Sequence, residues 1–323
     1  VSSALVTCAR DEGPYLLEWA CYHHLLGFDR IYIYSHDNND GSEELLWKMQ
    51  EAGLITYVDM TGRIPANEGV QQFVFDLAFH SIKEGNEADW MCVIDLDEFI
   101  VLKKHSSIYG FLSRYSVDTD GIVLNWQMFN ANSQILRADG LVVDRFMSVG
   151  RTNRRAVKTI AKVRSLTGWE NPHIPKYNKT EHLKVIYADG TLLRGEPSGL
   201  HDYYTSEEAV LNHYVTKSYE EFLVKIDRCG GMVRYEDRFN PNKKRVYIFP
   251  MQNSCLGKKQ LDEAIRHTFA YRRLKSYLKE VLSKHDLQEA QDKVLRQHEE
   301  LSQRLLRQVP DKEIQDIKQM LAL

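Results

Sequence analysis

The chain has 323 residues, of which 43% are hydrophobic and 27% are charged, and its formal net charge is -3. This balance is typical of a soluble globular protein and argues against nucleic acid or another polyanion as a general partner. The five cysteines, Cys8, Cys21, Cys92, Cys229 and Cys255, form no CxxC pair, so the sequence predicts neither a disulfide framework nor a zinc site. We therefore expect a reducing, cytoplasmic location.

No stretch approaches the roughly 20 consecutive apolar residues that a membrane-spanning helix needs. The most apolar run, residues 90–102, is interrupted by Asp95, Asp97 and Glu98. We therefore expect a chain that does not cross a membrane. It begins at Val1 without a signal-peptide pattern, which leaves open whether the natural N-terminus and its targeting information are included.

In the first hundred residues, β-rich runs alternate with segments of helical periodicity. The pattern predicts strands at 4–9, 30–34, 54–58 and 90–95 and helices at 15–26, 43–52 and 67–84. Such alternation is typical of a parallel sheet wound by helices. The fold class predicted here is α/β, with residues 1–102 as a Rossmann-like, nucleotide-binding half.

Three polar clusters follow predicted strands, at residues 10–14, 36–41 and 95–98. In open α/β sheets, ligands bind beyond the carboxyl ends of the strands, so these three loops are expected to converge on one crevice.

The pattern is less regular beyond residue 102. Short β-like runs at 122–126, 141–146 and 183–187 alternate with turns, and we assign 103–255 to an acceptor-binding half of a catalytic domain spanning 1–255. Residues 258–308 are almost free of Gly and Pro, which predicts long helices in a C-terminal helical region, 256–323.

The run Asp95-Leu96-Asp97-Glu98 ends the fourth predicted strand. Because side chains alternate along a strand, the carboxylates of Asp95 and Asp97 project to the same side. A divalent cation such as Mg²⁺ or Mn²⁺ would offset their repulsion and keep oxygen sites open for phosphates. The simpler alternative is a solvated acidic loop.

Several motifs, in this order, resemble glycosyltransferases of the GT-A type, in particular family-2-like and family-92-like enzymes. They are CARDEGPYLLEW at 8–19, DLDEF at 95–99, Trp126 with Phe129, and NHYVTKS at 212–218. The resemblance implies a GT-A fold and a metal-dependent, inverting transfer of a sugar from a nucleotide donor, usually a UDP-sugar, to a hydroxyl of a glycan or glycolipid.

The resemblance also implies roles for single residues. Arg10, Glu12 and Asp37 would bind the base and ribose, while Asp95 would face the ribose and the waters of the metal. The metal ligands would be Asp97, Asp95 and His213. Lys217 would reach the phosphates, and Lys158 matches a family lysine in a strand that enters the active site. Two departures, Asp11 for the usual Asn and Ser35-His36 for the usual Asp-Asn, leave the nucleoside open.

A general base should lie between the acidic run and His213. Asp139, Glu170 and Asp202 qualify by position, and Glu170 is preferred because the neighbouring Trp169 could stack on a sugar. Glu98, Trp126 and His173 complete the set of candidate site residues.

Two basic segments have alternative interpretations. Residues 151–164 could bind an anion or form an exposed strand and loop. The 266–279 segment interleaves Arg and Lys with aromatic residues, which could place an amphipathic helix on the inner face of a membrane or pack that helix on the catalytic domain. The C-terminal helices could also mediate oligomerisation.

Two other functions are compatible with these residues. Paired carboxylates serve nucleotidyltransferases and two-metal phosphodiesterases, which attack phosphorus rather than carbon. A non-catalytic carbohydrate-binding protein would tolerate loss of the acidic run.

Overall fold

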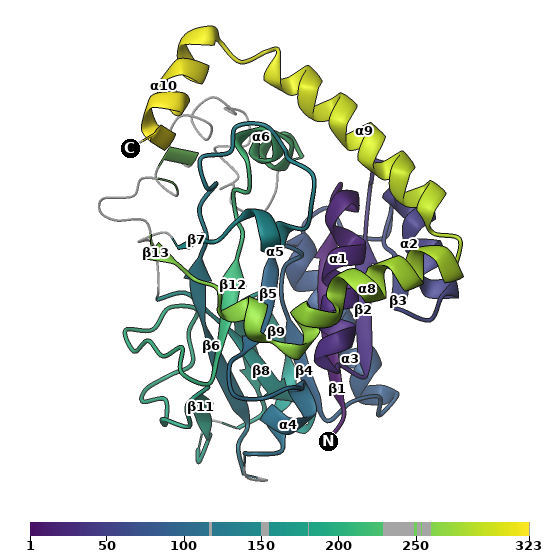
Figure 1. Ribbon diagram of the computed structural model, residues 1–323. Coiled ribbons are helices and arrows are strands. Elements are labelled where there is room, and N and C mark those ends of the chain that lie inside the picture. The colour runs from purple at the N-terminus through teal and green to yellow at the C-terminus, as the bar shows by residue number, and fades with distance from the viewer. Residues whose placement is uncertain are drawn as a thin grey trace.

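The computed structural model describes residues 1–115, 118–149, 155–179, 181–228, 249–250, 253 and 260–322. Its first half is a parallel sheet in the order β3-β2-β1-β4, formed by β1 (Ser3–Ala9), β2 (Arg30–Ser35), β3 (Thr56–Asp59) and β4 (Trp90–Val93). The helices α1 (Gly13–Leu26), α2 (Ser42–Glu51) and α3 (Val70–Glu84) connect these strands, as the alternating pattern predicted (Figure 1).

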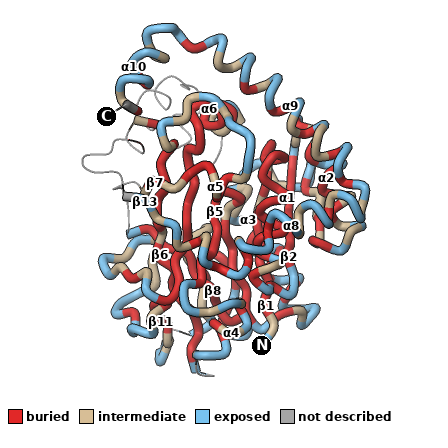
Figure 2. Tube along the Cα trace, viewed as in Figure 1, coloured by how far each residue is buried: buried red, intermediate tan, exposed pale blue. Residues whose placement is uncertain are grey.

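The sheet continues past β4 with both strand directions. Strand β8 (Val157–Lys162) lies antiparallel between β4 and β6 (Gly121–Met128). Strand β12 (Ala209–His213) then pairs in parallel with β6 and antiparallel with β5 (Glu98–Leu102), and β11 (Val185–Tyr187) pairs in parallel with β6. The central strands are buried along most of their length (Figure 2). The predicted α/β class, a mostly parallel sheet wound by helices, is thereby confirmed.

Smaller elements surround this sheet. A hairpin of β9 (Leu166–Asn171) and β10 (Ile174–Tyr177) follows the 3-10 turn η1 (Val163–Ser165) and contacts α3. Helix α4 (Ile108–Leu112) follows β5, and β7 (Ser148–Val149) pairs with β13 (Gln260–Leu261). Helix α6 (Tyr219–Asp227) follows β12 after the loop 214–218, and Ser218 and Glu221 form a capping box at its start.

The C-terminal helices α8 (Phe269–Lys284) and α9 (Gln288–Leu306) pack on helices of the first part of the chain and on α6. After the 3-10 turn η3 (Ala264–His267), α8 lies along α1, and α9 contacts α1, α2 and α6 (Figure 1). Leu274 of α8 and Val294 of α9 belong to the same hydrophobic cluster as Trp19 of α1. The final helix is α10 (Asp311–Ala322). The expected domain boundary at 255/256 lies outside the described residues.

One expected strand is wrong. Residues 141–146 were predicted as β, but Val142–Arg145 form a short helix, α5. The backbone amides of Val142 and Val143 donate to the carboxylate of Glu18, at 2.8 and 3.1 Å. The buried carboxylate of Glu18 thus accepts from two amides that have no partner within the helix. These two hydrogen bonds outweigh the β propensity of the Leu-Val-Val sequence.

No helix within the described residues is long and apolar enough to span a bilayer. Cys8, Cys21 and Cys92 are free thiols, while Cys229 and Cys255 lie outside the described residues.

Candidate active site

The acidic run forms one wall of a buried polar cluster at the end of β4. The ammonium of Lys158, which reaches in from β8, lies 3.1 Å from Oδ2 of Asp95 and 3.3 Å from Oε2 of Glu98. The side chain of Lys158 is fully buried. Gln71 of α3 donates to the other oxygen of Asp95 at 2.9 Å. Lys158, predicted to belong to the site, therefore pairs with two of its three acids.

Asp97 faces two cationic or potentially cationic groups. Its Oδ1 lies 3.3 Å from Nε2 of His213, and its Oδ2 contacts the ammonium of Lys225, from α6. Burial opposes ionisation of Asp97, but the Lys225 ammonium and then His213 outweigh it and hold the pKa of this carboxyl well below its usual range. Asp97 is therefore a carboxylate at neutral pH.

Strand pairing explains why His213 reaches the acidic run. In the antiparallel register of β12 and β5, His213 stands opposite Glu98, and the Tyr214 amide donates to the Asp97 carbonyl at 2.8 Å. Residues more than a hundred positions apart are thus fixed by backbone hydrogen bonds on rigid strands.

The pKa of Glu98 is shifted in the opposite direction to that of Asp97. Burial raises its pKa to about 7, although Lys158 acts in the other direction. Its Oε2 accepts from the Asp95 amide at 2.8 Å, whereas its Oε1 has no hydrogen-bond partner among the described residues and lies 4.0 Å from Nδ1 of His213. Glu98 therefore shapes the acidic turn from within the protein.

Lys217 lies in the loop between β12 and α6. Its φ is 51°, a left-handed conformation, and its ammonium sits 4.1 Å from the centre of the Tyr15 ring. Burial lowers the pKa of Lys217 to about 8, with Asp97 opposing the shift. The loop thus holds a cation near Asp97 at an energetic cost, as expected for a group that awaits an anionic partner.

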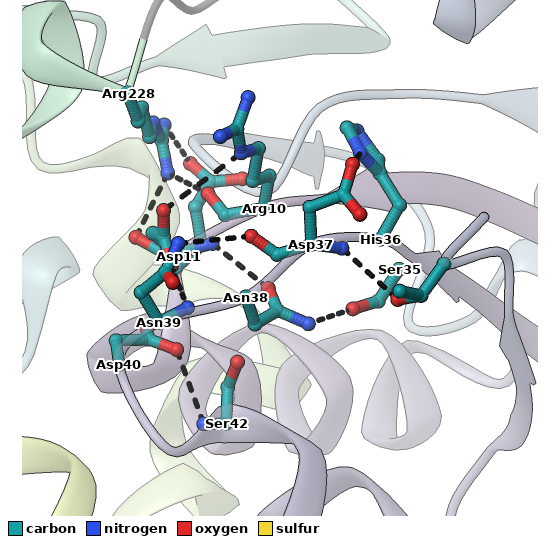
Figure 3. A network of polar contacts seen from close by, with 12 residues as sticks. Arg10, Asp11, Ser35, His36, Asp37, Asn38, Asn39, Asp40, Ser42 and Arg228 are labelled. Atoms are coloured by element: carbon teal, nitrogen blue, oxygen red, sulfur yellow. Dashed lines mark hydrogen bonds and ion pairs between the residues drawn. The ribbon is translucent and has the colours of Figure 1, made fainter. Parts of the chain in front are cut away.

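The first two loops interlock through reciprocal hydrogen bonds (Figure 3). The Asp11 amide donates to Oδ1 of Asn38 at 2.9 Å, and the Asn39 amide donates to Oδ1 of Asp11 at 2.5 Å. Asp40 accepts from the amides of Gly13 and Ser42, at 2.8 and 3.1 Å, and thereby satisfies the starts of both α1 and α2. Asp11 and Asp40 are therefore committed to holding the loops together.

Three other side chains of these loops take no part in the hydrogen bonds that join the two loops. The side chains of Arg10, His36 and Asp37 extend to the same side of the two loops in Figure 3. Asp37 is 55% exposed and lies 3.1 Å from Nδ1 of His36. Glu12, predicted to help bind the base and ribose, has its carboxylate paired with Arg228 at 2.6 Å.

Aromatic rings extend the cluster towards the β9–β10 hairpin. Trp126 packs edge-on against His213, with ring centroids 4.2 Å apart, and against His173, at 5.1 Å. Nδ1 of His173 lies 2.7 Å from the carbonyl oxygen of Val157. The structure therefore brings both of these predicted site residues, Trp126 and His173, beside the acidic run.

The three expected general-base candidates are not gathered with this cluster. Asp139 and Glu170 are exposed, and Asp202 is 88% exposed and paired with Arg155 at 2.8 Å. Trp169 is completely buried against α3, so it cannot stack on a sugar beside Glu170 as expected. In the basic segment 151–164, residues 151–154 lie outside the described part of the chain.

Sequence reasoning missed Lys225, Arg228 and Gln71. Arg228 donates to the carbonyls of Arg10 and Asp11, at 2.6 and 3.0 Å, and so fixes the first loop from the end of α6. Ser218 and Glu221 have the spacing of a capping box, which predicts the start of α6. Lys225 and Arg228 are three residues apart, so a helix beginning there would place both on one face.

Few side chains in the described part of the chain are placed to hold a metal ion. The described residues contain no group of three or more His, Cys, Asp or Glu side chains placed to hold an ion. Asp97 and His213 are the pair that fits, because a carboxylate oxygen and an imidazole nitrogen 3.3 Å apart can both reach one cation at about 2.1 Å.

The sequence matches a known family over most of its length. The family model described as Glycosyltransferase family 92 covers residues 10–245. A glycosyltransferase family 92 protein of Arabidopsis thaliana is 24% identical over 249 residues, 72% of this chain and 39% of the relative. One of Oryza sativa subsp. japonica is 26% identical over 116 residues, 36% of this chain and 19% of the relative. The chain thus spans less than half the length of either relative.

Among solved structures, TarS 1–349 of S. aureus in complex with UDP-GlcNAc has a TM-score of 0.36 at 10% identity, over 92% of this chain and 89% of that one. Glucosyl-3-phosphoglycerate synthase of Mycobacterium tuberculosis, in complex with Mn²⁺, UDP and glucosyl-3-phosphoglycerate, has a TM-score of 0.32 at 13% identity, over 61% and 73%.

Proposed function

The chain belongs to glycosyltransferase family 92, and we propose that it transfers a sugar from a nucleotide donor, a UDP-sugar in the first instance, to a hydroxyl of a glycan or glycolipid. The observation that carries this proposal is the convergence of Asp97, His213 and Lys217 beside the interlocked first two loops. These groups can receive a diphosphate next to a nucleoside.

The nucleoside would lie on the side of the two loops to which Arg10 and Asp37 extend. A carboxylate such as Asp37 accepts hydrogen bonds from a uracil N–H or from ribose hydroxyls. Arg10 can stack on a base or contact a phosphate through its planar guanidinium. The role expected for Glu12 moves to its backbone, because its carboxylate is already paired with Arg228.

We propose that Mn²⁺ or Mg²⁺ is held by Asp97 and His213, with Asp95 reaching it through water. Mg²⁺ prefers all-oxygen sites, so the imidazole favours Mn²⁺. Two protein ligands leave positions for phosphate oxygens, as is usual where a substrate completes the coordination. When bound, the cation would offset the charge that develops on the leaving diphosphate.

The protein's own cations would share that task. Lys217 would place its ammonium on the diphosphate, in a site where burial strengthens the attraction. Lys225 keeps the second oxygen of Asp97 occupied, so that the first oxygen points towards His213. Lys158 neutralises Asp95 and Glu98, which lets three acids share one turn.

The products distinguish the candidate reactions. The purified chain is incubated with UDP-glucose, UDP-galactose or UDP-N-acetylglucosamine and Mn²⁺, and the released nucleotide is identified by chromatography. Release of UDP that stops with EDTA supports glycosyl transfer, and UMP would indicate attack on phosphorus instead. Glycan binding with neither nucleotide binding nor release would identify a carbohydrate-binding protein.

We further propose that α8 faces an anionic membrane surface where a glycolipid acceptor would reside. Its aromatic residues Tyr271 and Tyr277 contact Asp144 and His24, so they pack inward. Its exposed residues include Arg272, Arg273, Lys279 and Phe269. A vesicle-binding assay tests this. The protein should bind vesicles that contain anionic lipid but not neutral vesicles, and the double variant Arg272→Glu/Arg273→Glu should lose this binding. The cytoplasmic location and oligomerisation stay predictions.

A further inference from the structure

His173 is oriented by a hydrogen bond that fixes its tautomer. It lies in the turn between β9 and β10, with Nδ1 2.7 Å from the Val157 carbonyl oxygen. A carbonyl only accepts, so Nδ1 carries the proton and Nε2 holds the lone pair. The hydrogen bond at Nδ1 is the one that the ring makes with the described residues, so Nε2 is without a partner there. The ring therefore presents a proton acceptor.

Packing holds the ring in this position. A Cβ at Gly199 would come within 2.9 Å of Cβ of His173, so only glycine allows the chain to approach so closely. The Gly199 carbonyl in turn accepts from the Val157 amide at 3.2 Å, which ties this contact to β8. On another side the ring contacts Trp126, which also touches His213. His173 is thus supported by rigid elements.

The electrostatic surroundings keep this imidazole uncharged. Burial, and then the Lys158 ammonium, lowers the pKa of His173 to about 4. Asp95 acts in the opposite direction. The pKa of His173 responds to Lys158, Asp95 and His213. The ring therefore lies near the cluster that we propose binds the donor diphosphate. A bound diphosphate would add negative charge there and favour the protonated ring as the reaction proceeds.

The neighbouring acids are poorly placed for the same task. Asp95 and Asp97 are paired with lysines, and Glu98 is completely buried. Of the exposed candidates, Asp202 is paired with Arg155. A base has to reach the acceptor hydroxyl directly, so geometry favours a partly exposed side chain with a free lone pair.

We propose that His173 is the general base of the transfer, an inference that rests on the proposed function. The acceptor hydroxyl would donate its proton to Nε2 while its oxygen forms a bond to the anomeric carbon. The bond from that carbon to the diphosphate breaks, and its electron pair leaves with the diphosphate oxygen. The imidazolium then releases its proton to water, which restores the neutral ring.

The test compares nucleophiles that do and do not need a base. Wild type, His173→Gln and His173→Asn are assayed with the UDP-sugar that gives the highest UDP release, using water or azide as the nucleophile. The side-chain amide that His173→Asn introduces can still donate to the Val157 carbonyl, but it cannot take up a proton at neutral pH. Thr167→Ala, at an exposed position of the same hairpin, is the control.

Both His173 variants should release UDP to water about 10²- to 10⁴-fold more slowly than wild type. Their reaction with azide, an anion with no proton to lose, should remain within a few-fold of wild type, as should UDP affinity. Water turnover at the wild-type rate would overturn the assignment. An equal loss of the azide reaction or of UDP affinity would also overturn it, in favour of a structural role.

Failure of the proposed function would look different. Wild type would then release UMP, or no nucleotide from any of the three donors. If wild type releases UDP and the His173 variants do so equally well, only the base assignment fails.

Discussion

Nε2 of His213 lies 3.3 Å from Oδ1 of Asp97, across two strands that pair antiparallel. The sequence separates these residues by more than a hundred positions, and the register of β12 against β5 brings them together. Their separation suits two ligands of one cation, and Lys225 on the far oxygen of Asp97 fixes which oxygen faces the imidazole.

His213→Ala should remove the effect of Mn²⁺ on nucleotide binding. If the imidazole is a metal ligand, UDP affinity in Mn²⁺ should fall by about tenfold or more, to near the metal-free value. Loss of a residue that only supports a metal ligand already costs about tenfold or more in metal affinity, and loss of the ligand itself should cost at least as much. Calorimetric titration of UDP with and without Mn²⁺ measures this. His267→Ala, an exposed histidine of η3, is the control, and a metal effect preserved in His213→Ala would refute the ligand role.

Lys158→Met should destabilise the fold. The substitution keeps the length of the side chain but leaves Asp95 and Glu98 without their shared cation, and breaking a buried pair costs about 3–5 kcal/mol. Protonation of Glu98, whose pKa burial already raises to about 7, should recover part of that loss at lower pH. Urea unfolding at pH 6 and pH 8 measures both effects.

Lys103→Met provides the comparison, since Lys103 is an exposed lysine directly after β5. It should change the free energy of unfolding by under about 0.5 kcal/mol. Equal midpoints for Lys158→Met and wild type would show that the buried pair is not formed.

Glu221 should make stability depend on acid pH. Its carboxylate receives two hydrogen bonds from Arg145, at 2.9 and 2.7 Å. Burial opposes ionisation, but Arg145 outweighs it and lowers the pKa of Glu221 to about 2, below its ordinary value of 4.5. A depressed acid pKa stabilises the fold fully above about pH 4.5, and that contribution is lost as pH falls towards 2.

Glu221→Gln should therefore cost about 3–5 kcal/mol at pH 7 and flatten the dependence of stability on pH between 4.5 and 2. Urea midpoints across this range, with exposed Glu207→Gln as control, check the prediction. A variant as acid-sensitive as wild type would contradict it.

Lys217 should make nucleotide binding weaken at alkaline pH. Because its pKa is lowered to about 8, the ammonium loses its proton as pH rises through that value, and the attraction for a diphosphate is lost with it. UDP affinity without added metal should be constant below about pH 7 and fall between pH 8 and 10. Lys217→Gln should bind weakly at every pH; a parallel decline in both proteins would assign the effect elsewhere.

The fold was largely predictable because its signals are local. Strand and helix periodicity placed β1 to β4 and their helices within a few residues. The acidic run could be assigned to the end of β4 for the same reason. The prediction of a strand at 141–146 failed because the buried carboxylate of Glu18, far away in the sequence, determines the conformation of this segment.

The site was less predictable where its contacts are long-range. Motif resemblance named Asp97, His213, Lys158 and Lys217, but no sequence pattern pairs Lys225 with Asp97 or Arg228 with Glu12. Glu170 looked attractive through its neighbour Trp169, yet that ring faces α3. Position along the chain cannot tell which face of a hairpin points towards the site.

We propose above that the nucleotide diphosphate binds at Asp97 through a divalent cation. Calorimetric titration of UDP in Mn²⁺ into wild type, Asp97→Asn and exposed Asp139→Asn tests it most directly, once unfolding curves show that all three are folded. Of the three proteins, Asp97→Asn alone should lose at least about tenfold in UDP affinity, 1.4 kcal/mol, and should gain nothing from Mn²⁺. Equal UDP affinity and an equal Mn²⁺ effect in all three proteins would contradict it.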